Sequence, residues 1–349
     1  MARCVLGTII PMTKTRSRVC IVTPALADAN NGNWQTARRW ASMLGQTYRV
    51  NLVPAWPHPG VDAPDVLLAL HARRSAASIA AWAQRYPQRP LLVALTGTDL
   101  YRDIAHDSSA QHALTVAHQL IVLQEAGPQQ LPHAHQHKCS VVFQSSTSRK
   151  PLVKTRHHLN VVVVGHLREE KSPHTVFEVA RHLKAQDGIH IKHIGDALEP
   201  ALGQAAQDTA QLCPHYQWVG GLSHSQTRQA IQRAHVLLHP SQMEGGAHVV
   251  MEAITSGTPV LASHVAGNVG MLGPEYGGYF PWNDSSAATA LLRQCRHSLD
   301  MDLHNPHNLL TQLTAQCEQR APLFAPVREA LALQTLVARA LASVPQHNP

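Results

Sequence analysis

The chain of 349 residues has no apolar run long enough to cross a lipid bilayer. Its uninterrupted hydrophobic stretches are short, whereas a membrane-spanning helix needs roughly 18 to 20 residues. Its six cysteines form no C-x-x-C pair, which disfavours a zinc knuckle or a disulfide framework. We therefore expect a cytoplasmic protein with no membrane partner.

Long runs of one charge are also missing, although 29 Lys and Arg outnumber 22 Asp and Glu. The basic residues are dispersed, and the aromatic residues that stack on bases make up only 5% of the chain. We therefore expect no nucleic-acid partner, although a basic protein with salt-dependent nucleic-acid affinity is the alternative from another class. The formal charge of +7 fits a small phosphorylated ligand at least as well.

Histidine is frequent, with 25 residues, and the densest run contains His133, His135 and His137. On an extended segment these alternate positions would point to one side, as in a metal clamp. A polar surface loop is the interpretation that we favour, because no second cluster accompanies the run. The D-x-D spacing of Asp300 and Asp302 lies among expected helices rather than at a strand end. We therefore expect neither a metal ion nor another cofactor.

Short apolar runs alternate with longer helical patterns through the first half of the chain. Strands are expected at 19–23, 49–54, 66–70, 91–95, 120–123 and 140–143, with helices such as 34–44 and 76–86 between them. Parallel neighbours need crossover connections, which are usually helices. The alternation therefore predicts a doubly wound parallel sheet.

The same alternation restarts after a polar, basic stretch from Ser145 to His158. Further strands are expected at 161–164, 189–194, 217–219, 236–238 and 259–262. We divide the chain into a flexible extension (1–18), two Rossmann-like domains (19–150 and 151–325) and a C-terminal helix (326–349) that packs back on the first domain. The expected α/β architecture is two doubly wound parallel-sheet domains that face each other across a cleft, which is the default ligand site.

A glycine-rich turn lies between the strands expected at 236–238 and 259–262. Gly245 and Gly246 lack side chains, so a phosphate group can approach the backbone there. A helix is expected from about Gly246, and its first amides, up to Ala247 and His248, would bind that phosphate. The pattern predicts a pyrophosphate site.

Two glutamates flank this turn. Glu244 and Glu252 are eight residues apart, which is about 12 Å along a helix at 1.5 Å per residue. A diphosphate between a hexose and a ribose has a comparable length. We therefore expect Glu244 to bind sugar hydroxyls and Glu252 to bind the ribose. The alternative is two ordinary helix glutamates, of which Glu244 merely favours the helix dipole.

A second motif follows the strand expected at 161–164. Arg168 and Lys171 lie on the next loop, before a helix that Ser172 is expected to cap. Cations at this position would neutralise a leaving diphosphate, a role that a metal ion has in other enzymes. The alternative is a solvated loop in which both cations pair with the two glutamates between them.

These motifs together resemble the donor-binding half of GT-B glycosyltransferases of the large retaining, nucleotide-sugar family. The resemblance rests on the Glu244 and Glu252 pair, the following Gly257-Thr-Pro-Val, and the Gly-x-Leu-x-x-x-Lys pattern that ends at Lys171. The chain departs from the family at His166, where Arg is usual, and at Gly32-Asn33, where a Gly-Gly pair is usual. The resemblance implies a GT-B enzyme.

More specific strings resemble the selenosugar synthase family of selenoneine biosynthesis. They lie between about Val19 and Leu292 and include Leu95-Thr-Gly-Thr-Asp-Leu-Tyr-Arg-Asp and Met243-Glu-Gly-Gly-Ala-His-Val. This resemblance implies a Se-glycosyltransferase that moves N-acetylglucosamine or glucose from UDP to selenophosphate, with later loss of phosphate. It also implies functional coupling to a selenophosphate synthetase and a downstream selenoneine synthase. A conventional glycosyltransferase with an oxygen acceptor is the alternative.

Selenophosphate is deprotonated at neutral pH, so it should need little help from a general base. We therefore expect the first domain to bind an anion rather than to display a catalytic dyad. Arg73 or Arg74 is expected to bind the acceptor phosphate, because a basic pair at a helix start opposes the dipole and favours a nearby anion. Gly32, Asn33 and Thr98 are expected to add hydrogen bonds.

Three further polar residues end expected strands. Asp99 is expected to bind a sugar hydroxyl or to cap the following turn, and His71 to bind the donor sugar or to be a satisfied core histidine. Asn268 is expected to contact the sugar. The expected catalytic residues are Glu244, Arg168, Lys171, Asp99 and His71. The expected donor-binding residues are Gly245, Gly246, Ala247, His248, Glu252 and Asn268.

Overall fold

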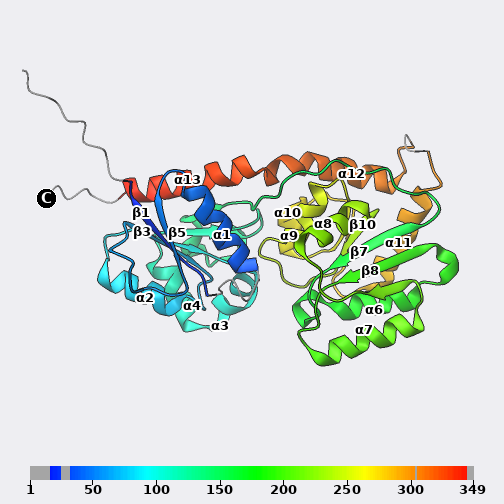
Figure 1. Cartoon of the computed structure of the whole chain (residues 1–349), viewed down its shortest axis with the longest axis horizontal. Helices are drawn as coiled ribbons and strands as arrows, with labels where there is room; N and C mark the ends of the chain where they lie inside the picture. The colour runs from blue at the N-terminus through cyan, green and yellow to red at the C-terminus, as the bar shows by residue number, and fades with distance from the viewer. Residues whose placement is uncertain (1–15, 25–31, 303–304, 344–349) are drawn as a thin grey trace, which may run out of the picture.

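The computed structural model describes residues 16–24, 32–302 and 305–343. Within these residues the chain forms two α/β domains that lie side by side (Figure 1). The flexible extension expected over 1–18 lies almost entirely outside the described residues. Residues 142–158, between the last strand of the first domain and the first strand of the second, form neither helix nor strand.

The first domain contains six parallel strands in the order β2-β1-β3-β4-β5-β6. The strands are β1 (Arg18–Val22), β2 (Arg49–Val53), β3 (Val66–Leu70), β4 (Leu91–Ala94), β5 (Gln119–Val122) and β6 (Cys139–Val141). The helices are α1 (Gly32–Leu44), α2 (Ala76–Arg85), η2 (Asp99–Asp103), α3 (Ile104–His106), α4 (Ser108–Val116), η3 (Pro128–Gln130) and α5 (His133–Gln136). All six strands expected in this half are confirmed.

The second domain also contains six parallel strands, in the order β12-β11-β10-β7-β8-β9. The strands are β7 (Leu159–Val164), β8 (Ile189–Ile194), β9 (Tyr216–Trp218), β10 (Val236–His239), β11 (Val260–Ser263) and β12 (Tyr279–Phe280). The helices are η4 (Glu169–Lys171), α6 (Pro173–His182), η5 (Ala185–Asp187), α7 (Pro200–Leu212), α8 (His224–Arg233), α9 (His248–Ile254), α10 (Ala266–Leu272), α11 (Ser285–Ser298), α12 (Leu309–Arg320) and η6 (Ala321–Phe324). The doubly wound fold expected from the sequence is confirmed.

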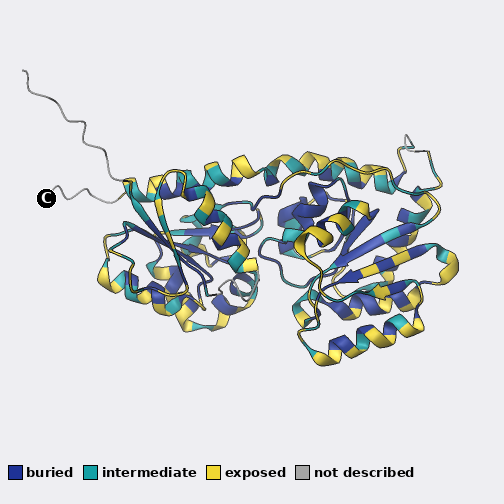
Figure 2. Ribbon diagram, in the orientation of Figure 1, coloured by how far each residue is buried: buried dark blue, intermediate teal, exposed yellow. Residues whose placement is uncertain are grey.

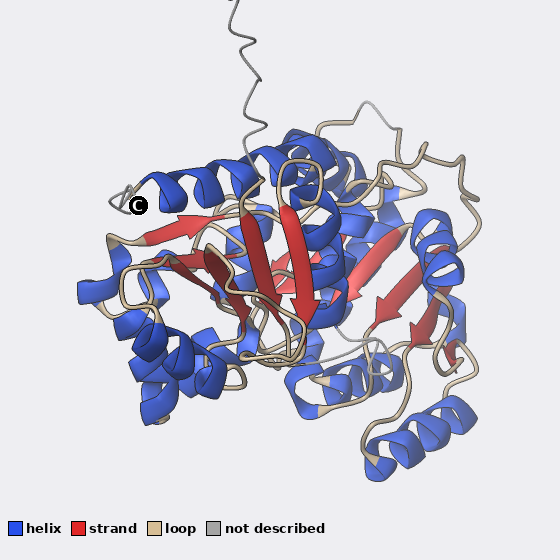
Figure 3. Ribbon diagram, turned by 60° about the vertical axis from the view of Figure 1, so that its left-hand side comes forward, coloured by secondary structure: helices blue, strands red, loops and turns tan. Residues whose placement is uncertain are grey.

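Both sheets are buried between helices (Figures 2 and 3). This explains the near-continuous apolar strands, such as the valines of β7, because a strand covered on both faces needs no polar side. Helix α13 (Pro326–Ala342) leaves the second domain and runs over the first, where Leu333 and Val337 join the hydrophobic core beside α1 (Figure 1).

In each sheet there is one point at which the chain stops adding strands on one side and continues on the other. In the second sheet the reversal lies between β7 and β10, and in the first sheet it lies between β1 and β3. Parallel α/β sheets bind ligands at the carboxyl ends of the strands at such a reversal. The loops that follow these strands carry most of the expected site residues.

One local prediction is wrong, and one helix begins two residues later than expected. Ser172 does not cap α6 through its side chain, because its backbone is left-handed (φ 50°) and its hydroxyl accepts a hydrogen bond from Trp282 Nε1 at 3.1 Å. The helix expected from Gly246 begins at His248. The histidine run that includes His133, expected to be a polar surface loop, forms a short helix, α5, that has no buried residue. Among the described residues, no helix combines the length and the apolar character that a membrane span requires.

Candidate active site

The carboxyl ends of β7 and β10 bring together Lys171, His239 and Glu244. Lys171 Nζ donates a hydrogen bond to Glu244 Oε1 at 2.6 Å, and His239 Nε2 lies 3.1 Å from the same oxygen. Burial alone would raise the pKa of Glu244, but the Lys171 charge and the His239 contact hold it well below its usual range. The reversal point of the second sheet therefore holds a buried, ionised carboxylate beside an ammonium group.

Arg168 lies on the same loop but has different neighbours. Its Nε atom is buried and has no hydrogen-bond partner among the described residues, and the nearest carboxylate oxygen, Glu170 Oε2, is 4.0 Å away. Glu170 Oε1 lies 3.5 Å from Arg102 Nη1, which belongs to the first domain. The alternative in which both loop cations pair with loop glutamates therefore applies to Arg168 alone. Lys171 pairs with Glu244 instead.

The glycine-rich turn is packed against the first domain. A Cβ atom on Gly245 would lie 2.4 Å from the backbone nitrogen of Gly97, and one on Gly246 would lie 2.7 Å from Leu123 Cβ. The missing side chains therefore let the two domains touch. Ala247 is buried and precedes the first residue of α9. That these amides bind a phosphate stays a prediction.

His248 connects the start of α9 to the first domain. Its Nε2 atom lies 3.5 Å from Arg39 Nη2, and its Nδ1 atom lies 3.9 Å from where a Gly32 Cβ atom would stand. Burial, followed by the charge of Arg39, lowers the pKa of His248 to about 3. Because a guanidinium group can only donate, His248 Nε2 accepts the hydrogen bond and the imidazole is neutral, with its proton on Nδ1.

Glu252 belongs to a separate ion-pair group. Its Oε1 atom lies 2.7 Å from His224 Nε2 and 4.0 Å from Arg228 Nη1. The hydrogen bond with Glu252 raises the pKa of His224. Glu252 is buried, and the two glutamates of the sequence motif therefore have different cationic partners.

Asn268 lies at the start of α10, close to the end of β11. Its Nδ2 atom donates hydrogen bonds to the carbonyl and the hydroxyl of Ser263 at 2.9 and 3.0 Å. Its Oδ1 atom is buried and has no hydrogen-bond partner among the described residues. A Cβ atom on the preceding Gly267 would lie 2.1 Å from the carbonyl oxygen of Glu244. Asn268 is therefore next to the Glu244 loop, with one acceptor atom unused.

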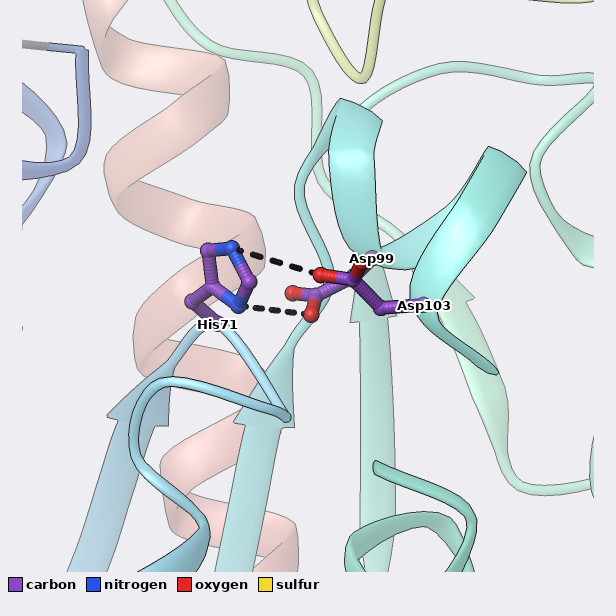
Figure 4. A group of neighbouring side chains, drawn as sticks. All are labelled: His71, Asp99 and Asp103. Atoms are coloured by element: carbon purple, nitrogen blue, oxygen red, sulfur yellow. Dashed lines mark ion pairs between the residues drawn. The ribbon is translucent and has the colours of Figure 1, made fainter. Parts of the chain in front are cut away.

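In the first domain, His71 faces two carboxylates (Figure 4). Its Nδ1 atom lies 2.6 Å from Asp99 Oδ1, and its Nε2 atom lies 3.2 Å from Thr98 Oγ1 and 4.0 Å from Asp103 Oδ2. Asp99 also accepts hydrogen bonds from the backbone nitrogens of Ala72 at 2.9 Å and Thr96 at 3.3 Å, so it joins the loops after β3 and β4 and does not cap the turn that follows it. The first domain therefore contains a histidine–carboxylate pair, and that it binds an anion rather than displaying a catalytic dyad stays a prediction.

The same group has the residue types of a metal site. His71, Asp99 and Asp103 have ligand atoms within 4.8 Å of one another, and they are the one such group among the described residues. However, Asp103 also accepts hydrogen bonds from Arg73 Nε at 2.9 Å and Arg102 Nε at 3.1 Å. Two guanidinium groups would repel a metal cation at close range. We therefore interpret the group as a hydrogen-bonded network.

The other expected acceptor residues are more dispersed. Arg74 is exposed, and its backbone nitrogen lies 3.4 Å from His71 Nδ1. Gly32 and Asn33 begin α1, and the Gly32 carbonyl accepts a hydrogen bond from Thr36. Five residues that contact this site were not expected as site residues, namely Arg39, Arg102, Asp103, His224 and Glu329. Arg102 and Asp103 do lie within the string that begins at Leu95, but only the fold shows what they contact.

Comparison with known proteins shows a family match in the second half of the chain. Residues 144–298 match the family model described as glycosyl transferases group 1. No curated protein sequence gives a significant match.

Solved structures resemble the chain over most of its length. Sucrose-phosphate synthase from Thermosynechococcus elongatus has a TM-score of 0.73 at 15% identity, covering 94% of this chain and 100% of the other. HepE from Anabaena in complex with UDP-glucose has a TM-score of 0.68 at 14% identity, covering 93% and 99%. The pneumococcal O-GlcNAc transferase GtfA in complex with UDP and GlcNAc has a TM-score of 0.57 at 20% identity, covering 79% and 57%. At these identities the likeness establishes the GT-B fold.

Proposed function

We propose that this chain, which has a GT-B fold and whose residues 144–298 belong to the group 1 glycosyltransferase family, transfers a sugar from UDP to a small anionic acceptor. The observation that carries the proposal is the buried Lys171–Glu244 ion pair at the reversal point of the second sheet. The pair consists of a carboxylate, which we propose binds sugar hydroxyls, and a cation, which we propose binds the diphosphate, at the position where α/β sheets bind ligands.

The proposed donor is UDP-glucose or UDP-N-acetylglucosamine. In support, a similar fold has been solved with UDP-glucose and another with UDP and GlcNAc. Glu244 orients the sugar, and Glu252 binds the ribose after displacing His224. Asn268, whose Oδ1 atom is unused, adds an acceptor beside the sugar.

The diphosphate of the donor is proposed to bind at the loops after β7 and β10. Lys171, Arg168 and the amides of Gly245 to His248 supply the positive charge and the hydrogen-bond donors. As UDP leaves, these groups stabilise the negative charge that develops on its β-phosphate. In this proposal the transfer needs no resident metal ion.

The proposed acceptor is selenophosphate, as the sequence resemblance implies. Its selenium atom attacks C1 of the sugar and forms a C–Se bond, while the bond from C1 to the β-phosphate oxygen breaks and its electron pair leaves with UDP. Water then attacks phosphorus, the P–Se bond breaks, and its electron pair stays on selenium. This sequence yields a selenosugar and phosphate, and it places the enzyme between a selenophosphate synthetase and a selenoneine synthase.

The second candidate is a glycosyltransferase with an oxygen acceptor. The His71–Asp99 pair favours it, because a histidine oriented by a carboxylate is a suitable general base for an alcohol. The two candidates differ in whether turnover depends on the imidazole. A thiophosphate or selenophosphate acceptor would not need it, whereas an alcohol would.

The experiment is an acceptor competition with the purified full-length protein. UDP-glucose and UDP-N-acetylglucosamine are each incubated with selenophosphate, thiophosphate or a panel of alcohols, and UDP release and product mass are measured. We expect UDP release with selenophosphate and a selenium-containing sugar product. Preferred use of an alcohol would favour the second candidate, and no UDP release above the blank without acceptor would contradict both.

A further inference from the structure

Asp103 is a buried carboxylate that holds two arginines of the first domain. It accepts a hydrogen bond from Arg73 Nε at 2.9 Å and another from Arg102 Nε at 3.1 Å. The Asp103 side chain is only 5% exposed, whereas those of Arg73 and Arg102 are 40% and 45% exposed. Each guanidinium group is therefore fixed through its Nε atom and partly open to solvent at its outer N–H groups, although Arg102 Nη1 also contacts Glu170 at 3.5 Å.

A third arginine approaches this pair from the second domain. Glu170 lies between Arg102 and Arg168, with oxygen-to-nitrogen distances of 3.5 and 4.0 Å. Asp99, whose carboxylate lies within 4.8 Å of that of Asp103, and Asp107, which interacts electrostatically with Arg73, are further carboxylates around the three guanidinium groups. The buried Nε atom of Arg168 has no hydrogen-bond acceptor among the described residues. An unsatisfied buried donor beside two half-exposed guanidinium groups favours an acceptor oxygen from a bound anion.

The arginine group is adjacent to the proposed donor site. Lys171 follows Glu170 in the chain and pairs with Glu244. The backbone oxygen of Glu170 accepts a hydrogen bond from the backbone nitrogen of Gln242, two residues before Glu244. An anion bound by Arg102 would therefore lie beside the sugar and the diphosphate rather than at a remote surface.

We infer that Arg102, together with Arg73 and Arg168, binds the phosphate group of the acceptor, and that Asp103 orients two of these three side chains. The inference rests on the proposed function for the anion's role as acceptor. The ligand class is a small tetrahedral oxyanion, for which paired arginine forks provide several parallel N–H groups. Glu170 competes with this anion for Arg102 and Arg168.

The test is a calorimetric titration of the full-length protein with thiophosphate and with inorganic phosphate. We expect R102Q to weaken anion binding about 10- to 100-fold, because one charge-assisted contact is lost. We expect E170Q to tighten it, because a competing carboxylate is removed. The affinity for UDP should change less than about twofold in R102Q, whereas E170Q also frees Arg168, which belongs to the proposed diphosphate site. R85Q, at the far end of α2, is the matched control and should bind the anion like the wild type.

The opposite directions of the two variants separate binding from a merely structural role. Equal anion affinity in R102Q and the wild type would overturn the inference, as would no anion binding by the wild type at millimolar concentrations. A parallel loss of UDP affinity in R102Q would also overturn it, since Arg102 would then belong to the donor site. If the anion binds as expected but selenophosphate is not converted, the proposed acceptor fails while the anion site stands.

Discussion

At the scale of single residues, the charge of Glu244 is the feature on which the proposed chemistry depends most. The side chain is buried, and an ionised carboxylate is stable there only because Lys171 and His239 contact it. The same ion pair fixes the position of Lys171 beside the loop after β7. Glu244 therefore has two roles, since it contacts the sugar in the proposed complex and it holds a cation in place.

Glu244→Gln removes this charge with little change in volume. We expect kcat/KM for the UDP-sugar to fall at least about 100-fold, because a buried group directed at the reacting sugar is lost and Lys171 is released. Circular dichroism should show that the fold is retained. Glu318→Gln, at an exposed position of α12, is the control and should keep full activity. Wild-type turnover by the Glu244 variant would rule out its proposed role.

His224 gives the donor site a predictable pH dependence. Its hydrogen bond to Glu252 raises the pKa of the imidazole, so protonated His224 stabilises the folded protein at low pH, and this contribution is lost as the pH rises through the raised pKa. The ribose must replace His224 at Glu252. We therefore expect UDP affinity to increase between about pH 6 and about pH 8.

The measurement is a UDP titration at several pH values in constant salt. His224→Asn removes the titrating group and should give an affinity that changes little with pH. A wild-type affinity that is flat or falls with pH would contradict the displacement of His224 by the ribose.

Some of these residues could be predicted from the sequence and others could not, for a physical reason. Lys171 and Glu244 could be predicted because each follows a strand in a motif of local spacing. Arg102 and Glu170 are 68 residues apart, and Arg39 and Glu329 are 290 apart. Such pairs form only after distant parts of the chain have folded and packed together, and no local pattern encodes which charges meet.

At the scale of elements, α13 is fastened to the first domain by one buried carboxylate. Glu329 accepts hydrogen bonds from Arg39 Nε at 2.9 Å, from Trp40 Nε1 at 2.7 Å and from the backbone nitrogen of Ser145 at 2.8 Å. Arg39 in turn contacts His248. The C-terminal helix therefore supports a residue at the domain interface as well as the core of the first domain.

Glu329→Ala would leave several buried donors without an acceptor. We expect it to lower the free energy of unfolding by about 3 to 5 kcal/mol, as for other buried ion pairs that lose one partner. Urea denaturation monitored by tryptophan fluorescence measures the change. Arg328→Ala, at the exposed neighbouring position, should have an effect within about 0.5 kcal/mol. Equal stability of the two variants would show that α13 is held by apolar contacts alone.

Elements with a strong periodic signal could be predicted, and short ones could not. All eleven strands expected from apolar runs are present, because two buried faces impose a continuous hydrophobic sequence. The two-residue β12 has no such signal, since it is defined by its pairing with β11. The η2 turn could not be predicted from the sequence either, although it presents Asp99 and Asp103 to His71.

At the scale of the whole molecule, the two domains meet through backbone atoms at Gly97 and Gly245. A Cβ atom on Gly97 would lie 2.8 Å from the backbone nitrogen of Gly245, closer than such atoms pack. Glu125 and Arg320 add an ion pair across the same interface, with a distance of 2.9 Å. Close contact of the domains therefore depends on two positions without side chains.

Gly97→Ala tests whether this contact is needed for catalysis. The added methyl group meets main-chain atoms that have no alternative position, so we expect the domains to separate slightly and kcat to fall at least about 10-fold. Each domain keeps its own core, so the thermal midpoint should change by only a few degrees. Small-angle scattering should show a larger radius of gyration. Gly277→Ala, where the new Cβ atom would meet only ordinary contacts, is the control. Unchanged kcat in the Gly97 variant would mean that transfer does not require the domains to approach this closely.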